Sequence, residues 1–215
     1  MGIRQTDANL NRMFRDEAEL DESQKSAYEY RRSREMMEVM AGSDYCLDLH
    51  SSPTAGSPTV AVCSETAFSI VSKLPVEIRC VGFESAMPGG TEEWATKNGI
   101  VAVGVECGQH EEPETFVNAR KIATAFLAQL DMVDAPVREY PQRTMKLSRA
   151  YFTKTAEFRV VKAFSDFEPV KKGQLIGLDS GEEVFAKTDG FVLFANDRDL
   201  AGVEGFLELT ERRFF

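Results

Sequence analysis

The chain has 215 residues, of which 43% are hydrophobic and 28% charged. This is ordinary for a globular protein and allows one large domain, or one domain with a small module. A formal net charge of -10 makes nucleic acid and anionic membrane surfaces poor partners. No apolar run approaches the roughly 18 residues that span a bilayer, and the first residues lack the apolar core of a signal peptide.

The four cysteines stand singly, at positions 46, 63, 80 and 107. None forms a Cys-x-x-Cys pair, which argues against a cysteine zinc cage or a redox motif. We interpret them as small buried side chains in a reducing compartment. The sequence therefore predicts a cytoplasmic protein with neither a nucleic-acid nor a membrane partner.

The first fifteen residues are rich in side-chain donors and poor in apolar side chains. Arg4, Asn11 and Arg12 lie within them. Guanidinium forks and amides of this kind bind carboxylates. The residues alone also allow a solvated arm that pairs with the acidic run at 16–22.

A helix is predicted next, beginning at Asp21 or Ser23 and ending at Gly42, with a charged face that includes Glu29 turned to water. Residues 45–49 then form a short apolar run that ends in His50, and a Ser/Pro/Gly-rich loop follows. An imidazole at the carboxyl end of a strand is well placed to bind a metal or a substrate. The alternative is a polar residue that happens to end a strand.

Strands and helices alternate up to about residue 130, which predicts a three-layer α/β domain. The most apolar run, 100–105, predicts a strand buried on both faces, and Glu106 follows it as a candidate general base. A strand-end carboxylate turned to solvent is the alternative for Glu106. The remaining elements are strands at 59–63 and 78–83, helices at 64–73 and 91–98 (the latter capped by Thr91), and a helix that begins at Pro113 with Phe116 on its inner side.

From about residue 136 the helical pattern disappears. Residues 137–143 have the composition of a linker, and short strands separated by turns at 167–173, 179–181 and 189–190 follow. We therefore predict an α/β domain at 1–135 and a small all-β domain at 144–215. The turns resemble those of lipoyl and biotinyl carrier domains, but no lysine stands in an attachment motif. We interpret the module as structural and as a wall of a pocket.

Three motifs carry a resemblance to a known family. They are Asn11-Arg12-x-Phe14 with Arg4 upstream, Asp48-Leu49-His50, and Glu106-Cys107-Gly108. In order and spacing they resemble the succinylglutamate desuccinylase/aspartoacylase family of the zinc-carboxypeptidase-like superfamily, over essentially the whole chain. The resemblance implies a three-layer α/β/α sandwich followed by a small all-β domain that shields the pocket.

The resemblance also implies a function, a cofactor and residue roles. The activity would be zinc-dependent cleavage of the amide bond of an N-acyl amino acid. His50 would be the third zinc ligand, and Glu106 the general base that activates zinc-bound water. Arg4 would polarise the scissile carbonyl and stabilise the oxyanion, while Asn11 and Arg12 would hold a substrate carboxylate.

The chain departs from the family pattern at its start. The family's first two zinc ligands come from a Gly-x-His-Gly-x-x-Glu-type segment upstream of Arg4, which this sequence lacks. His110 cannot be assumed to replace it, and Tyr151 or Lys154 could complete the site from the β-module. We expect an N-terminally shortened hydrolase, whose exposed sheet edge would favour homo-oligomers. The alternative is a metal-free binding or regulatory protein that uses the Arg/Asn pocket for a carboxylate ligand.

Overall fold

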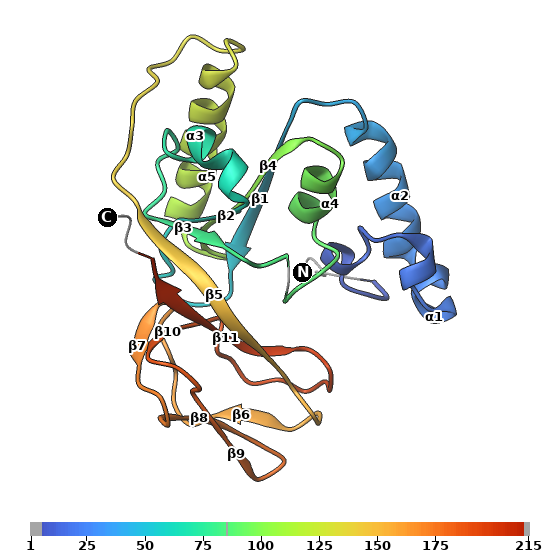
Figure 1. The fold of residues 1–215 in the computed structure, drawn as a ribbon, viewed down its shortest axis with the longest axis vertical. Coiled ribbons are helices and arrows are strands. Elements are labelled where there is room, and N and C mark those ends of the chain that lie inside the picture. The colour runs from blue at the N-terminus through green and yellow to red at the C-terminus, as the bar shows by residue number, and fades with distance from the viewer. Residues whose placement is uncertain (1–5, 85, 213–215) are drawn as a thin grey trace.

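A computed structural model describes residues 6–84 and 86–212 (Figure 1). Within them, one eight-stranded sheet has the order β1-β4-β2-β3-β5-β11-β10-β7, and a three-stranded sheet has the order β6-β8-β9. The large sheet contains β1 (Tyr45–Ser52), β2 (Val60–Cys63), β3 (Ile78–Val81), β4 (Val101–Gln109), β5 (Arg143–Phe152), β7 (Glu168–Val170), β10 (Gly190–Leu193) and β11 (Glu204–Glu211). The small sheet contains β6 (Phe158–Val160), β8 (Leu175–Asp179) and β9 (Glu182–Phe185).

Helices cover both faces of the first half of the large sheet. Both α4 and α5 contact β4 and β1, and they lie on opposite sides of these strands (Figure 1). This confirms the predicted three-layer α/β/α arrangement. No helix of the described residues is long and apolar enough to cross a membrane. The helices are η1 (Leu10–Arg12), η2 (Glu17–Glu19), α1 (Glu22–Ser26), α2 (Tyr28–Met40), η3 (Glu65–Ala67), α3 (Phe68–Val71), α4 (Thr91–Lys97) and α5 (Pro113–Gln129).

The alternation of side chains along β4 decides which residues reach the site. Val103 and Val105 pack with Ile122 of α5 in the main core. Ala102 points to the other face and packs with Ala95 of α4. Since strand side chains alternate with period two, Glu106 shares the α4 face with Ala102.

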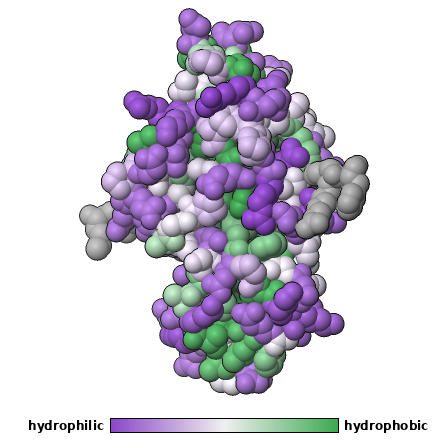
Figure 2. Space-filling view, turned by 90° about the vertical axis from the view of Figure 1, so that its left-hand side faces the viewer, coloured by the Kyte–Doolittle hydropathy of each residue, from purple (hydrophilic) through white to green (hydrophobic). Residues whose placement is uncertain are grey.

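The large sheet runs without a break into the C-terminal part of the chain. β5 pairs in parallel with β3 and antiparallel with β11. The boundary predicted between 135 and 144 therefore falls just before a strand that is hydrogen-bonded to both parts. Tyr151, Phe158 and Phe206 stack in the core of the β-module. Figure 2 shows a mostly hydrophilic face, with apolar surface gathered at the lower end, where β6, β8 and β9 lie.

Several local predictions are wrong. Thr91 is the first residue of α4, and Gly90 precedes the helix as its N-cap. Phe116 is 71% exposed, because α5 turns a different stripe towards the sheet. Glu29 is only 4% exposed, since its carboxylate accepts main-chain N–H groups of Thr6, Asp7 and Ala8.

Two short strands of the β-module were not predicted. β7 contains Pro169, which a strand tolerates at a sheet edge where the proline has no N–H to donate. β9 pairs with β8 across the predicted turn at 179–181 and is too short and polar for its sequence to signal a strand.

Asp179 provides a stability test for the β-module. It is 2% exposed and accepts hydrogen bonds from the Tyr151 hydroxyl (2.6 Å), the Lys154 N–H (2.7 Å) and the Thr155 N–H (3.1 Å). Burial raises the pKa of Asp179, but hydrogen bonds from Thr155, Tyr151 and the main chain outweigh this and hold that pKa below its usual value. The charged form is therefore the one that stabilises the folded state.

We expect Asp179→Asn to lower the free energy of unfolding near pH 7 by about 2 kcal/mol, because the amide cannot accept all these donors. The Asp179 contribution is present above the unfolded-state pKa and is lost as pH falls through the lower folded-state pKa. The difference between variant and wild type should therefore shrink on acidification, as measured by urea unfolding at several pH values. Glu182→Gln, at an exposed ion pair with Lys154, is the control and should change little. A difference that is constant with pH would contradict this prediction.

Candidate active site

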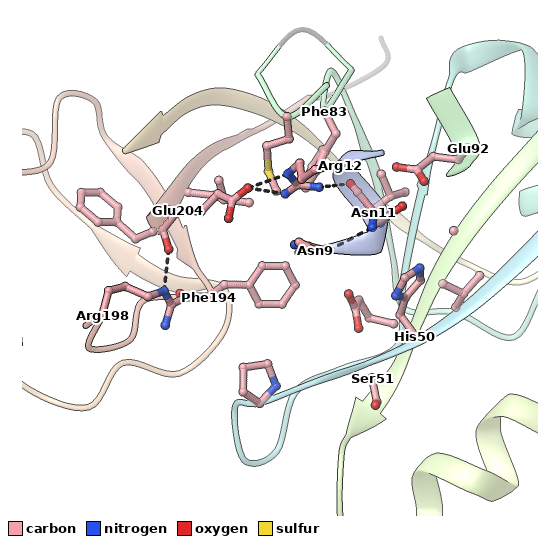
Figure 3. Close-up of a pocket in the computed structure, with 18 residues that line it drawn as sticks. Asn9, Asn11, Arg12, His50, Ser51, Phe83, Glu92, Phe194, Arg198 and Glu204 are labelled. Atoms are coloured by element: carbon pink, nitrogen blue, oxygen red, sulfur yellow. Dashed lines mark hydrogen bonds and ion pairs between the residues drawn. The ribbon is translucent and has the colours of Figure 1, made fainter. Parts of the chain in front are cut away.

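The predicted site residues that the structure describes converge on one cavity. Asn11, Arg12, His50 and Glu106 all line a cavity of about 170 Å³ between the α/β part and the β-module (Figure 3). His50 and Glu106 lie side by side because β1 and β4 pair in parallel with these two residues in register. His50 and Glu106 both lie past the midpoint of their strands, so the cavity sits towards the carboxyl ends of β1 and β4.

His50 is held by Asp48, two residues earlier on the same face of β1. Its Nε2 lies 2.9 Å from the Asp48 carboxylate, which leaves Nδ1 as the ring nitrogen that can face a ligand. Burial lowers the pKa of His50, but the hydrogen bond and charge of Asp48, with the charges of Glu106 and Glu92, raise it to about 9. Burial raises the pKa of Asp48. The hydrogen bond and the charge of His50 outweigh burial, so the pKa of Asp48 lies below its usual value. A carboxylate behind an imidazole is the usual support of a metal-binding histidine.

Glu92 is a site residue that the sequence analysis missed. It projects from the first turn of α4 into the cavity and lies above Gly104, where an added Cβ would meet the carboxylate at 3.8 Å, an ordinary van der Waals contact. Burial raises the pKa of Glu92, and the charge of Asp48 adds to this. Gly104, the one residue without a side chain in the apolar run at 100–105, was the available signal that another group lies over the strand at this point.

Asn11 lines the cavity and also fixes the helix beside it. The Asn9 side chain accepts from the Asn11 N–H and caps η1. The Asn11 side-chain oxygen accepts from the Thr91 N–H (2.9 Å) and the Thr91 hydroxyl (3.2 Å) at the start of α4. Asn11 therefore joins the N-terminal segment to the helix that carries Glu92, and its amide nitrogen is the group left for a ligand.

Arg12 is paired within the protein. Its Nε donates to Glu204 of β11 at 3.0 Å, and a second guanidinium nitrogen also contacts that carboxylate (Figure 3). Burial raises the pKa of Glu204, but Arg12 and Arg198 outweigh it, so Glu204 has a pKa below its usual value. A substrate carboxylate at Arg12 must therefore share or displace the interaction with Glu204, a residue that the sequence did not single out.

The remaining candidates are Arg4, His110, Tyr151 and Lys154. Arg4 is outside the described residues. His110 contacts the Ser51 hydroxyl through Nδ1 (2.8 Å) and borders a neighbouring cavity that it shares with His50. Tyr151 and Lys154 are held at Asp179 within the β-module and do not line the cavity.

The described residues do not complete a zinc site. Over residues 6–84 and 86–212, no group of three or more His, Cys, Asp or Glu side chains is arranged to hold a metal ion. A catalytic zinc site normally has three protein ligands. The described residues supply one imidazole ligand, His50, which Asp48 orients through a hydrogen bond. One ligand does not make a complete zinc site.

Asp166 ties the β-module to the loop after β1. Its carboxylate accepts from the hydroxyls of Ser52 (2.9 Å), Thr54 (3.1 Å) and Ser57 (2.7 Å), and from the Phe194 N–H (3.0 Å). Three of these donors come from the segment that directly follows His50. A single side chain therefore fixes two walls of the cavity relative to each other.

We expect Asp166→Asn to lower the free energy of unfolding by about 1–3 kcal/mol, since an amide nitrogen cannot replace the lost acceptor. Amide hydrogen exchange should accelerate at residues 52–57 and at Phe194, which mass spectrometry of peptides can follow. Asp199→Asn, at an exposed ion pair, is the matched control and should behave like the wild type. Unchanged exchange in both segments would show that Asp166 does not hold these walls.

The comparisons with solved structures show the fold. A succinylglutamate desuccinylase from Vibrio parahaemolyticus superposes with a TM-score of 0.74 at 18% identity, covering 98% of this chain and 67% of that one. The desuccinylase from Vibrio cholerae gives 0.75 at 17% identity, covering 99% and 68%. The product-bound ectoine utilization protein EutE (DoeB) from Ruegeria pomeroyi gives 0.65 at 17% identity, covering 96% and 68%.

A search of curated proteins found no match. The sequence of residues 1–131 matches the family described as the succinylglutamate desuccinylase/aspartoacylase catalytic domain. This range contains η1 and the strands β1 and β4, and so all the predicted site residues. The chain belongs to the succinylglutamate desuccinylase/aspartoacylase family.

Proposed function

We propose that this chain carries the active-site residues of a zinc-dependent deacylase that cleaves the amide bond of an N-acyl amino acid in the cytoplasm. The observation that carries the proposal is the pairing of His50 with Glu106 in one cavity with Asn11 and Arg12. Family membership supports a deacylase. The four free cysteines suit a reducing compartment.

Each residue has a role that its chemistry supports. Glu106 is the general base that accepts a proton from the attacking water. The Asn11 amide and the Arg12 guanidinium hold the substrate carboxylate, with Glu204 giving way or sharing Arg12. Arg4 stabilises the negative charge that develops on the carbonyl oxygen.

Zinc, when bound, would supply a Lewis acid for the carbonyl and lower the pKa of water. His50 would contribute Nδ1, since Asp48 engages Nε2. We propose that the other two ligands come from outside the described residues and that this chain supplies only part of the site. The chain spans about two thirds of the length of its structural relatives, with 67% and 68% for the two Vibrio enzymes.

A metal-free carboxylate-binding protein is the second candidate. The described residues lack a three-ligand metal group, while Asn11 and Arg12 are held in place by Thr91 and Glu204 without any metal. Such a protein would bind an N-acyl amino acid and leave it intact.

Zinc titration and a hydrolysis assay, run on the dialysed chain and on a form extended upstream to include the two further ligands, separate the two candidates. Stoichiometric zinc binding with turnover would support the deacylase. Binding of the acyl amino acid without zinc affinity or turnover, and its loss in Arg12→Ala, would support the binding protein.

For the deacylase, we expect Glu106→Gln to lower turnover by about 100- to 10,000-fold, because the amide cannot accept the proton. Affinity for the N-acyl amino acid, measured by calorimetry, should change little. Glu114→Gln on the exposed face of α5 is the control and should keep wild-type turnover. Wild-type turnover in Glu106→Gln would remove this residue from the mechanism.

We also propose that copies of the chain associate through β1. Among the described strands β1 is at the edge of the sheet and pairs with β4, and Tyr45 and Leu49 are 40% and 41% exposed. An edge strand with exposed apolar side chains can accept another strand. We expect a homo-oligomer by light scattering that Leu49→Lys weakens, whereas a monomer at all concentrations would contradict the proposal.

A further inference from the structure

We propose that the acyl group of the substrate is uncharged and apolar, and that Phe194 is the residue that selects it. The proposal rests on the proposed deacylase function, since it concerns the acyl half of the substrate in the same cavity. Such an acyl group differs from a succinyl group, which carries a carboxylate in addition to that of the amino acid. Three observations support it: the composition of the cavity wall, the state of its guanidinium groups and the conformation of Phe194.

One part of the cavity wall is apolar, beside a polar part that carries Arg12 and Glu204. The β-module contributes Phe194, Phe206 and Leu207, and the opposite side contributes Phe83 and Met87. Phe206 and Leu207 are fully buried and form the core behind the wall, so the apolar surface open to a ligand comes mainly from Phe194 and Met87. A surface of this kind binds an alkyl or aromatic group through the removal of apolar area from water.

The guanidinium groups of the described lining are already engaged. Arg12 contacts the Glu204 carboxylate. Arg198 donates to the main-chain oxygens of Glu204 (2.7 Å), Asp197 (3.0 Å) and Phe194 (3.2 Å). In the proposed complex, Arg12 receives the carboxylate of the amino-acid half. The described lining then keeps no guanidinium for a carboxylate on the acyl group. That carboxylate would also lie near the negative charges of Glu92, Glu106 and Glu204.

Phe194 is held in an unusual backbone conformation. Its φ is 56°, in the left-handed region that bulky side chains rarely adopt. Charged side chains hold both of its main-chain polar groups: the N–H donates to Asp166 and the carbonyl accepts from Arg198. The ring points into the cavity between Arg198 and His50 (Figure 3). Strained positions of this kind concentrate at ligand-binding sites, because the surrounding structure maintains them for their placement.

The same conformation provides a clean test variant. Glycine adopts a positive φ at no steric cost, so Phe194→Gly removes the ring while the turn keeps its geometry. Phe152→Ala removes an exposed ring of the β-module that does not line the cavity and is the matched control. Thermal unfolding of both variants shows whether the fold is retained.

The probes are N-pentanoyl-L-alanine and N-succinyl-L-alanine, which carry one carboxylate in the amino-acid half and differ in the terminal ethyl or carboxylate group of the acyl chain. Calorimetry on the full chain measures the affinity of each. We expect the wild type to bind the pentanoyl compound at least about tenfold more tightly than the succinyl compound. A preference of this size is what a small difference in apolar surface gives in an apolar pocket. The ratio should fall to near one in Phe194→Gly and stay at the wild-type value in Phe152→Ala.

Equal or tighter binding of the succinyl compound by the wild type would overturn the proposal. An unchanged ratio in a folded Phe194→Gly would overturn the role of Phe194. A hydrolysis assay with zinc, run beside the binding measurements, keeps the proposed function separate. No turnover with the affinity ratio intact would reject the deacylase and leave the apolar preference, whereas no binding of either compound would reject both.

Discussion

The register between β1 and β4 is the constraint on which the site depends. The two strands run in parallel, and His50 lies opposite Glu106. Because side chains alternate along a strand, a slip of β4 by one residue would send Glu106 to the α5 face, where the main hydrophobic core lies, and would separate it from His50. Val103 and Val105 prevent that slip, since they are buried in the same core. The apolar residues of β4 therefore fix the position of the catalytic candidates.

Around this pair, the site is built by contacts between distant parts of the chain. Asn11 fixes the start of α4 and with it Glu92, and Asp166 fixes the loop after His50. Glu29 on α2 holds the main chain at residues 6–8, which lead into η1. Most of these contacts link carboxylate or amide oxygens to main-chain N–H or hydroxyl groups. The cavity is thus held by directional hydrogen bonds, and its shape has little freedom to adapt.

The sequence predicted the parts of the fold that depend on local pattern. The buried run at 100–105 indicated β4, and the helix beginning at Pro113 was recognised from its apolar period. Asn11, Arg12, His50 and Glu106 were found because motif spacing places them, and the structure brings all four to one cavity. Arg4 stays a prediction.

What the sequence could not reveal depends on tertiary contacts. Glu204 and Phe194 have no local signature, since their significance comes from pairing with Arg12 and from a turn held by Asp166. The sequence around Glu29 is typical of a charged helix face turned to water. Its burial is favourable only because main-chain N–H groups of residues 6–8 donate to its carboxylate.

The ion pair between Arg12 and Glu204 joins residues that are 192 positions apart. Closing a loop of that length costs chain entropy that only a nearly complete fold repays, so this contact belongs to the late steps of folding. The cavity is then among the last features to assemble and among the first to open when the two ends of the chain separate. A nascent or partly unfolded chain would carry His50 and Glu106 side by side without the wall that closes over them, and ligand binding would report on the completion of folding.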